Sequence, residues 1–163
     1  MANIWIIGAG GIAQEYAKVL NNLGYDYDVI GRGINSATTF QEKTNHPVII
    51  GGLKSFLEKA PVIPTHAIIA TPISELSSNI IDLLNYGVKN ILSEKPGFLY
   101  PKECKEVALL SYEKNANVFL AYNRRFYSSV IEAQKIIHED GGVKSFHFEF
   151  TEWGHVIEKL NKP

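Results

Sequence analysis

Small residues near the start of the chain stand at a spacing that suits phosphate binding. Gly8, Gly10 and Ala13 follow the apolar run Ile4–Ile7. In such a turn the first glycine allows a tight strand-to-helix connection, the second lets the backbone approach a pyrophosphate, and the third position needs a small residue for close packing. Glycine-rich turns also open helices in proteins that bind no ligand. The context nevertheless predicts a dinucleotide-binding turn, whose residues are Gly8, Gly10, Gly11, Ile12 and Ala13.

The end of the second predicted strand lacks the carboxylate that folds binding NAD usually carry there. An Asp or Glu about 20 residues beyond the glycine turn normally holds the ribose 2′-hydroxyl. This chain has Gly31 and then Arg32, and a guanidinium can hold a 2′-phosphate with two hydrogen bonds. The residues therefore favour NADP over NAD, with Ser36 as a further donor. The alternative is that Arg32 simply faces solvent in a tight turn.

Lys95, in the sequence Glu-Lys-Pro, is the best candidate for a catalytic side chain. Hydride transfer between an alcohol and a nicotinamide also requires that the hydroxyl proton be moved. A lysine at a strand end is able to carry this proton if it is partly buried or lies near other cations. Lys95 could instead hydrogen-bond the cofactor ribose, or it could be a surface lysine beside a proline turn.

Four consecutive residues after the sixth predicted strand are candidates for contact with the substrate. Two neighbouring guanidiniums, those of Arg124 and Arg125, suit a carboxylate or a phosphate. They could equally form salt bridges between domains, and Tyr122 could pack either beside the nicotinamide or in the core. The predicted substrate-binding residues are Tyr122, Asn123, Arg124 and Arg125.

Strands and helices alternate along the part of the chain that must position these residues. Short apolar runs predict strands at Asn3–Ile7, Tyr27–Ile30, Pro47–Ile50, His66–Ala70, Asn90–Ser93 and Asn117–Ala121. Helical periodicity predicts helices at Gly11–Leu23, Asn35–Thr44, Leu53–Lys59, Ser74–Tyr86, Lys102–Asn115 and Phe126–Glu139. Because several strands are continuously apolar, we expect an α/β fold with a Rossmann-like, doubly wound parallel sheet. The carboxyl ends of its strands would bring Thr71, Pro72 and Glu94 to the same edge as the glycine turn.

The segment Val143–Trp153 has a different pattern, since Phe146, Phe148 and Phe150 alternate with polar residues. This alternation is typical of a half-buried antiparallel strand. A lone strand of this kind is not stable, so either another chain completes its sheet or the sequence is a piece of a longer protein. We expect the second. The prediction is a Rossmann domain over residues 1–122, then a connecting helix and one strand of an incomplete α+β domain over 123–163.

The composition limits which classes of partner the protein can bind and which cell compartment suits it. The 163 residues carry 16 basic and 17 acidic side chains, so no overall field favours nucleic acid or an acidic membrane surface. The apolar runs are shorter than the ~20 residues of a membrane helix, and the first one does not resemble a signal peptide. The single cysteine, Cys104, is expected to be buried or half-buried in a helix and suits a reducing cytosol. The histidines show no metal-ligand spacing. We therefore expect a cytoplasmic protein without a metal, a membrane or a nucleic-acid partner.

Four motifs together resemble the glucose–fructose oxidoreductase / inositol dehydrogenase / MocA (Gfo/Idh/MocA) family. They are Gly-Ala-Gly-Gly-Ile-Ala at Gly8–Ala13, Ala70-Thr71-Pro72, Ser93-Glu94-Lys95-Pro96 and Tyr122-Asn123-Arg124-Arg125-Phe126. The resemblance covers the family's N-terminal domain, its connecting helix and the first strand of its second domain. It implies an NAD(P)-dependent oxidoreductase that acts on a sugar, a nucleotide sugar or a cyclitol, with Lys95 against the nicotinamide and the substrate.

The resemblance also marks what this sequence lacks. Family members take an Asp/His pair from the second domain for acid–base chemistry, and His155 does not lie in that motif. Leu76 stands near the position where many members carry a histidine after the Thr-Pro turn. Members also use the open sheet of the second domain in oligomer contacts, which implies a homo-oligomer for a longer protein.

Two functions follow as expectations. The first is the cofactor-binding part of a dehydrogenase or reductase, which alone would bind a dinucleotide but turn over its substrate poorly or not at all. The alternative is a non-catalytic NADP-binding regulator or sensor that acts through a protein partner. Lys95 favours the enzyme weakly, because a sensor has no need to keep it.

Overall fold

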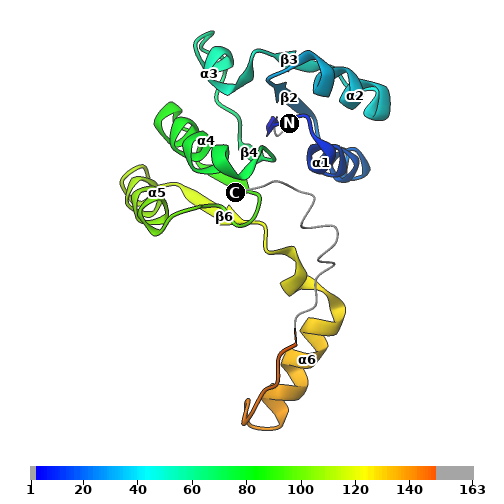
Figure 1. Ribbon diagram of the computed structural model, residues 1–163, viewed down its shortest axis with the longest axis vertical. Helices are drawn as coiled ribbons and strands as arrows, with labels where there is room; N and C mark the ends of the chain where they lie inside the picture. Colours follow the sequence, from blue (N-terminus) through cyan, green and yellow to red (C-terminus); the bar gives the residue numbers. More distant parts are fainter. Residues whose placement is uncertain (1–2, 150–163) are drawn as a thin grey trace. The chain divides into compact units, whose positions relative to one another are not determined.

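Strand β1 (Ile4–Ile7) lies in the middle of a six-stranded sheet in the computed structural model, which describes residues 3–149 (Figure 1). The strands are all parallel, in the order β3-β2-β1-β4-β5-β6. Strand order therefore reverses between β1 and β4, which is the switch point of a doubly wound sheet. This confirms the predicted Rossmann-like fold. The other strands are β2 (Tyr27–Gly31), β3 (Val48–Ile50), β4 (His66–Ile69), β5 (Asn90–Ser93) and β6 (Asn117–Leu120).

The sheet separates two apolar layers. Side chains alternate between the faces of a strand, so Trp5 and Ile7 pack into one layer while Ile4 and Ile6 pack into the other. All four residues of β1 are buried. Continuous burial of this kind explains why the strand is apolar throughout.

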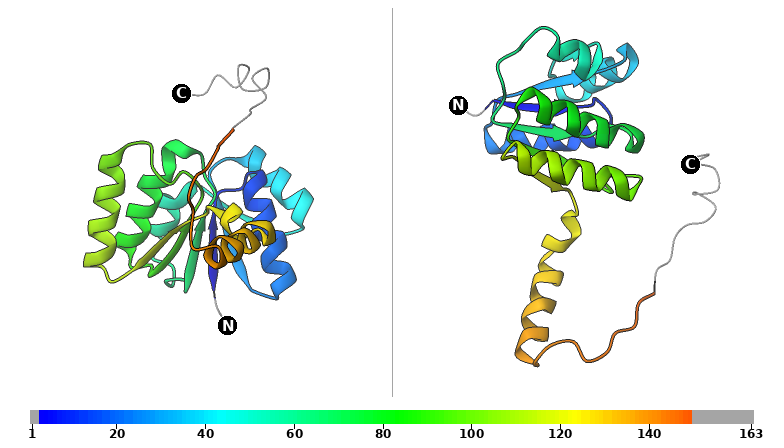
Figure 2. Two further views of the ribbon diagram at one scale, coloured as in Figure 1. Left: turned by 90° about the horizontal axis from the view of Figure 1, so that it is seen from below. Right: turned by 90° about the vertical axis from the view of Figure 1, so that its left-hand side faces the viewer.

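Helices cover both faces of the sheet (Figure 2). Apolar side chains of α1 and α2 belong to the layer of Ile4 and Ile6, whereas those of α3, α4 and α5 belong to the layer of Trp5 and Ile7. The helices are α1 (Gly11–Leu23), α2 (Ile34–Thr44), α3 (Gly52–Leu57), α4 (Ile73–Tyr86) and α5 (Pro101–Glu113). No helix in the described residues is both long and apolar enough to span a membrane. Each predicted strand and helix before residue 122 is present, with ends within two residues of the prediction.

The chain divides into two units, Met1–Tyr122 and Asn123–Pro163. The second begins with a 3₁₀ helix, η1 (Asn123–Phe126), and continues as α6 (Ser128–Glu139). None of its described residues is buried. The strand predicted over Val143–Trp153 is absent from residues 143–149, and its remainder lies outside the described residues. A strand needs a neighbouring strand for its backbone hydrogen bonds, and the described part of this unit provides none.

Cys104 is exposed, so the prediction that it is buried or half-buried was wrong. It lies on α5, where Val107 is the buried residue and the inward stripe continues through Leu110. Cys104 stands at the margin of that stripe, because the helical period turns it away from the sheet.

The packing of α4 against the sheet is open to a direct test. Leu83 is 0% exposed in the core, and Leu83→Ala should lower the free energy of unfolding by about 2–5 kcal/mol, because it leaves a cavity. The matched variant Leu109→Ala truncates a leucine that is 56% exposed on α5, and its effect should stay within about 0.5 kcal/mol. Urea denaturation of the two variants measures both values, and equal losses would contradict the assigned core.

Candidate dinucleotide-binding site

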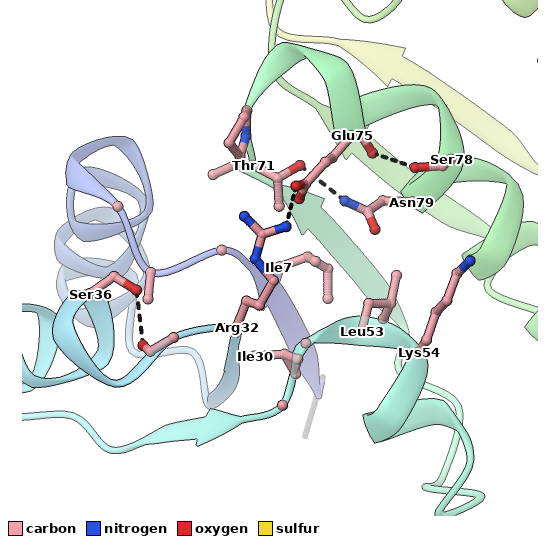
Figure 3. A pocket seen from close by; sticks show the side chains of 18 of the residues that line it. Ile7, Ile30, Arg32, Ser36, Leu53, Lys54, Thr71, Glu75, Ser78 and Asn79 are labelled. Atoms are coloured by element: carbon pink, nitrogen blue, oxygen red, sulfur yellow. Dashed lines mark hydrogen bonds and ion pairs between the residues drawn. The ribbon is translucent and has the colours of Figure 1, made fainter.

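A pocket of about 600 Å³ opens at the carboxyl edge of the sheet, around the switch point (Figure 3). Its walls come from the segments that follow β1, β2, β3 and β4, together with one face of α4. Open α/β sheets bind ligands at this place. The lining residues are Ile7, Gly8, Ala9, Gly10, Ile30, Arg32, Gly33, Ser36, Gly51, Gly52, Leu53, Lys54, Ala70, Thr71, Pro72, Glu75, Ser78, Asn79 and Asp82.

Gly8 is required by the protein's own backbone. Its φ is +114°, and a Cβ there would lie 2.4 Å from the carbonyl oxygen of Ala70. Two hydrogen bonds fix the crossing: the Gly8 N–H donates to the carbonyl of Ile30, and the Ala70 N–H donates to the carbonyl of Ile7, each at 2.8 Å. A side chain at Gly8 would therefore force β1 and β4 apart.

Gly10 is different, because nothing in the described residues requires a glycine there. A Cβ on Gly10 would meet no atom of residues 3–149 within 4 Å, and its φ of −83° is open to any residue. Gly10 is the N-cap of α1 and provides no side-chain hydrogen bond to the first turn. The free N–H groups of a helix start attract anions, so this open space suits a phosphate.

The other residues of the glycine turn take structural or peripheral positions. Ala13 is 0% exposed on the buried face of α1, where a small residue lets the helix pack closely on the sheet. Gly11 and Ile12 are exposed and do not line the pocket. Of the five turn residues that the sequence analysis names, Gly8 and Gly10 therefore belong to the pocket wall.

Arg32 lies at the mouth of the pocket and forms an ion pair with Glu75 (Figure 3). The guanidinium comes from the loop after β2, and the carboxylate comes from the first turn of α4. The stem of Arg32 lies over Gly52, where a Cβ would be 3.8 Å from its Cγ. The side chains of Arg32 and Glu75 are 74% and 33% exposed, so a ligand can reach both groups.

Ser36 and Thr71 also line the pocket, and each has an internal partner. The Ser36 hydroxyl donates to the carbonyl of Gly33 at 3.1 Å. The Thr71 hydroxyl accepts a hydrogen bond from the Asn79 amide at 3.0 Å, and Pro72 is the N-cap of α4. These bonds hold the β4–α4 turn and the start of α2 in place around the opening.

The polar face of α4 also belongs to the pocket, although the sequence patterns did not predict it. Glu75, Ser78, Asn79 and Asp82 line the pocket at helical spacing, and Lys54 joins them from α3. One oxygen of Asp82, Oδ2, is buried and has no hydrogen-bond partner in the described part of the chain. The signal was present in the sequence, since polar residues three or four positions apart follow the Thr-Pro turn on a single helix face.

Glu94 and Lys95 follow β5, which lies beyond β4 in the sheet, and neither lines the pocket. The Tyr16 hydroxyl of α1 donates to Glu94 Oε1 at 2.7 Å. Burial, and then the bond to the carboxylate, raise the pKa of Tyr16 well above its ordinary value. Lys95 is exposed and makes no hydrogen bond or ion pair within residues 3–149. The bond from Tyr16 thus fixes the strand end that carries Lys95.

The predicted substrate-binding residues fall on both sides of the boundary between the units. Tyr122 closes the first unit, and its hydroxyl lies 3.5 Å from the carbonyl of Pro96, next to Lys95. Asn123, Arg124 and Arg125 are exposed and form the start of the second unit, in η1. In residues 3–149, no three His, Cys, Asp or Glu side chains gather closely enough to hold a metal ion.

Comparison with protein families identifies one match. The family described as an oxidoreductase family with an NAD-binding Rossmann fold, Gfo/Idh/MocA, matches residues 2–122. Among curated proteins, no sequence matches this chain.

Solved structures share the fold. The WlbA dehydrogenase from Bordetella pertussis, in complex with NADH and UDP-GlcNAcA, gives a TM-score of 0.74 at 16% identity, over 85% of this chain and 42% of that one. A 3-ketoreductase variant from Actinomadura kijaniata, in complex with TDP-benzene and NADP, gives 0.72 at 16% identity, over 87% and 44%. The UDP-N-acetylglucosamine 3-dehydrogenase GnnA from Acidithiobacillus ferrooxidans gives 0.70 at 15% identity, over 83% and 41%. This chain therefore spans about two fifths of their length.

The bond between Tyr16 and Glu94 predicts a measurable contribution to stability. Tyr16→Phe removes the hydroxyl donor and leaves the carboxylate without it, so the free energy of unfolding should fall by about 1–2 kcal/mol. Tyr25→Phe is the control, because Tyr25 is 47% exposed and its hydroxyl has no hydrogen-bond partner in the described residues. Urea denaturation should find the control unchanged, and an equally stable Tyr16→Phe variant would argue against the bond.

Proposed function

This chain belongs to the Gfo/Idh/MocA oxidoreductase family, with an NAD-binding Rossmann fold over residues 2–122. On that premise we propose that it is the cofactor-binding part of an NAD(P)-dependent dehydrogenase or reductase. The proposed reaction moves a hydride to or from a sugar, a nucleotide sugar or a cyclitol. Support for this substrate class comes from one structural relative in complex with UDP-GlcNAcA and another that is a UDP-N-acetylglucosamine 3-dehydrogenase.

The observation that carries the proposal is the space at Gly10. The start of α1 opens into a pocket at the switch point of the sheet, and a glycine stands where the protein itself has room for a side chain. A pyrophosphate would fill that space and accept hydrogen bonds from the backbone N–H groups of the first turn. Gly8, Gly10, Gly11, Ile12 and Ala13 together form this turn.

The remaining cofactor contacts are proposed on either side of the phosphates. Arg32 and Ser36 would receive the adenosine ribose, and Arg32 offers a 2′-phosphate its guanidinium, which is the basis for the proposed preference for NADP. Thr71, Pro72, Glu94 and Lys95 follow the strands on the other side of β1 and would face the nicotinamide half. When bound, the nicotinamide supplies the hydride acceptor or donor.

Lys95 is the proposed catalytic residue. Its ammonium group has no hydrogen bond or ion pair in the described residues, so it can exchange a proton with a substrate hydroxyl or carbonyl oxygen. Tyr16 would act as a positioning residue, since it holds Glu94 beside Lys95. Arg124 and Arg125, with Tyr122 and Asn123, are the proposed substrate contacts, and guanidiniums suit an anionic substrate group.

Turnover is proposed for a longer protein rather than for this chain alone, which spans about two fifths of its structural relatives. A homo-oligomer formed through the second domain belongs to the same proposal. The alternative of a regulator that acts through a protein partner is supported neither by the described residues nor by the comparisons.

Titration of the 163-residue chain with NADPH and NADH, followed by nicotinamide fluorescence, tests the proposal. We expect saturable binding of both, tighter for NADPH. Arg32→Asp should remove that preference, because it replaces the guanidinium by a carboxylate that repels a 2′-phosphate. Failure of the chain to bind either dinucleotide would refute its assignment as a cofactor-binding unit.

Gly10→Asp separates the phosphate site from the stability of the fold. Asp is a favoured N-cap residue with room at this position, so the free energy of unfolding should hold steady or rise by a few tenths of a kcal/mol. The carboxylate would occupy the phosphate site and repel its charge, so both dinucleotides should bind at least about tenfold more weakly. Gly10→Asn is the neutral control of nearly equal size and should weaken binding less. Unchanged binding in Gly10→Asp would mean that phosphates do not bind at α1.

A further inference from the structure

The ion pair at the pocket mouth supplies a carboxylate that the end of β2 lacks. Arg32 stands where folds that bind NAD usually carry an acidic residue. Glu75, which is 43 residues further along the chain, brings its carboxylate to the same guanidinium from α4 (Figure 3). Both groups line the pocket.

The stability of the fold does not account for this pairing. The side chains are 74% and 33% exposed, and an ion pair in contact with water contributes little to stability. An acidic residue in the first turn of α4 is favoured by the helix dipole. That preference explains a carboxylate at position 75, but it does not direct the carboxylate to Arg32 across the opening.

A dinucleotide with a 2′-phosphate and one without it meet this pair differently. The 2′-phosphate of NADP needs the guanidinium that Glu75 already holds, so it must displace the carboxylate and accept its repulsion. NAD has no such group and leaves the pair intact. The other charged side chains of the pocket are Lys54 and Asp82, which carry opposite charges and leave no net bias between them.

We infer that Glu75 is a specificity-determining residue, which competes with the 2′-phosphate for Arg32 and so narrows the preference of this chain for NADPH over NADH. The inference rests on the proposed function. It names a residue that sets how strongly the two dinucleotides are distinguished, and it places that residue on α4 rather than at the end of β2.

Glu75→Gln is the direct test, because it keeps the size of the side chain and removes its charge. NADPH should bind about three- to fivefold more tightly to this variant at low salt, since Arg32 is released from its partner. The affinity for NADH should change by less than about twofold. Nicotinamide fluorescence titrations of the whole chain measure both dissociation constants.

Two further variants show whether the effect passes through Arg32. Glu15→Gln removes the same charge and breaks an exposed ion pair with Lys18 on α1, outside the pocket. It should leave both affinities unchanged. In an Arg32→Gln background, Glu75→Gln should improve NADPH binding by no more than about twofold, because only screened repulsion remains to be relieved.

The outcomes separate the two proposals. If the wild-type chain binds both dinucleotides but Glu75→Gln leaves their affinity ratio unchanged, the inference is wrong and the proposed function stands. An equal gain in the Arg32→Gln background would also overturn it, since the effect would then be general repulsion. If no variant binds either dinucleotide, the proposed function fails and the inference fails with it.

Discussion

The site depends on a contact between two backbones, where the turn after β1 passes the carbonyl of Ala70. A Cβ at Gly8 would lie 2.4 Å from that oxygen, which is too close for any real contact, so the turn exists only because Gly8 has no side chain. The contact fixes the direction in which the chain leaves β1. It therefore fixes where α1 begins, and with it the open space at Gly10, directly over the point where strand order reverses. The anion site proposed at the start of α1 is thus a consequence of how β1 and β4 pack.

The residues of the glycine motif fall into two groups, those required by packing within the protein and those that packing does not explain. Gly8 and Ala13 are required by the packing of the protein: Gly8 lies against a neighbouring backbone, and Ala13 lies on the face of α1 that packs on the sheet. Gly10 satisfies no such demand, and Ser, Asn or Asp would cap α1 slightly better by the usual preferences. A glycine at an N-cap position that no packing contact restricts is best explained by a ligand that occupies the space beside it.

The sequence was sufficient where a local pattern determines structure. Continuous apolar strands such as Ile4–Ile7 are required by burial on both faces of a parallel sheet, so their presence predicted the sheet and its open edge. The sequence alone was insufficient where two interacting residues lie far apart along the chain. Nothing near Glu75 indicates that its carboxylate meets Arg32, because the two are brought together only when β4 takes its place beside β1. The predicted burial of Cys104 was wrong for a simpler reason. Only a narrow stripe of α5 faces the sheet, so residues at the margin of that stripe are exposed.

The two ends of the proposed cofactor site are mechanically connected. The hydroxyl of Tyr16 lies on α1, the helix whose first turn would hold the phosphates, and it bonds to Glu94 beside the proposed catalytic Lys95. A reacting group is effective only if its distance from the bound cofactor is held within a fraction of an ångström. The helix and this part-buried bond would therefore set the distance between the bound phosphates and the end of β5. The exposed mouth at Arg32 is free of that requirement, so the proposed selectivity there can rest on a weak ion pair without disturbing the chemistry proposed at Lys95.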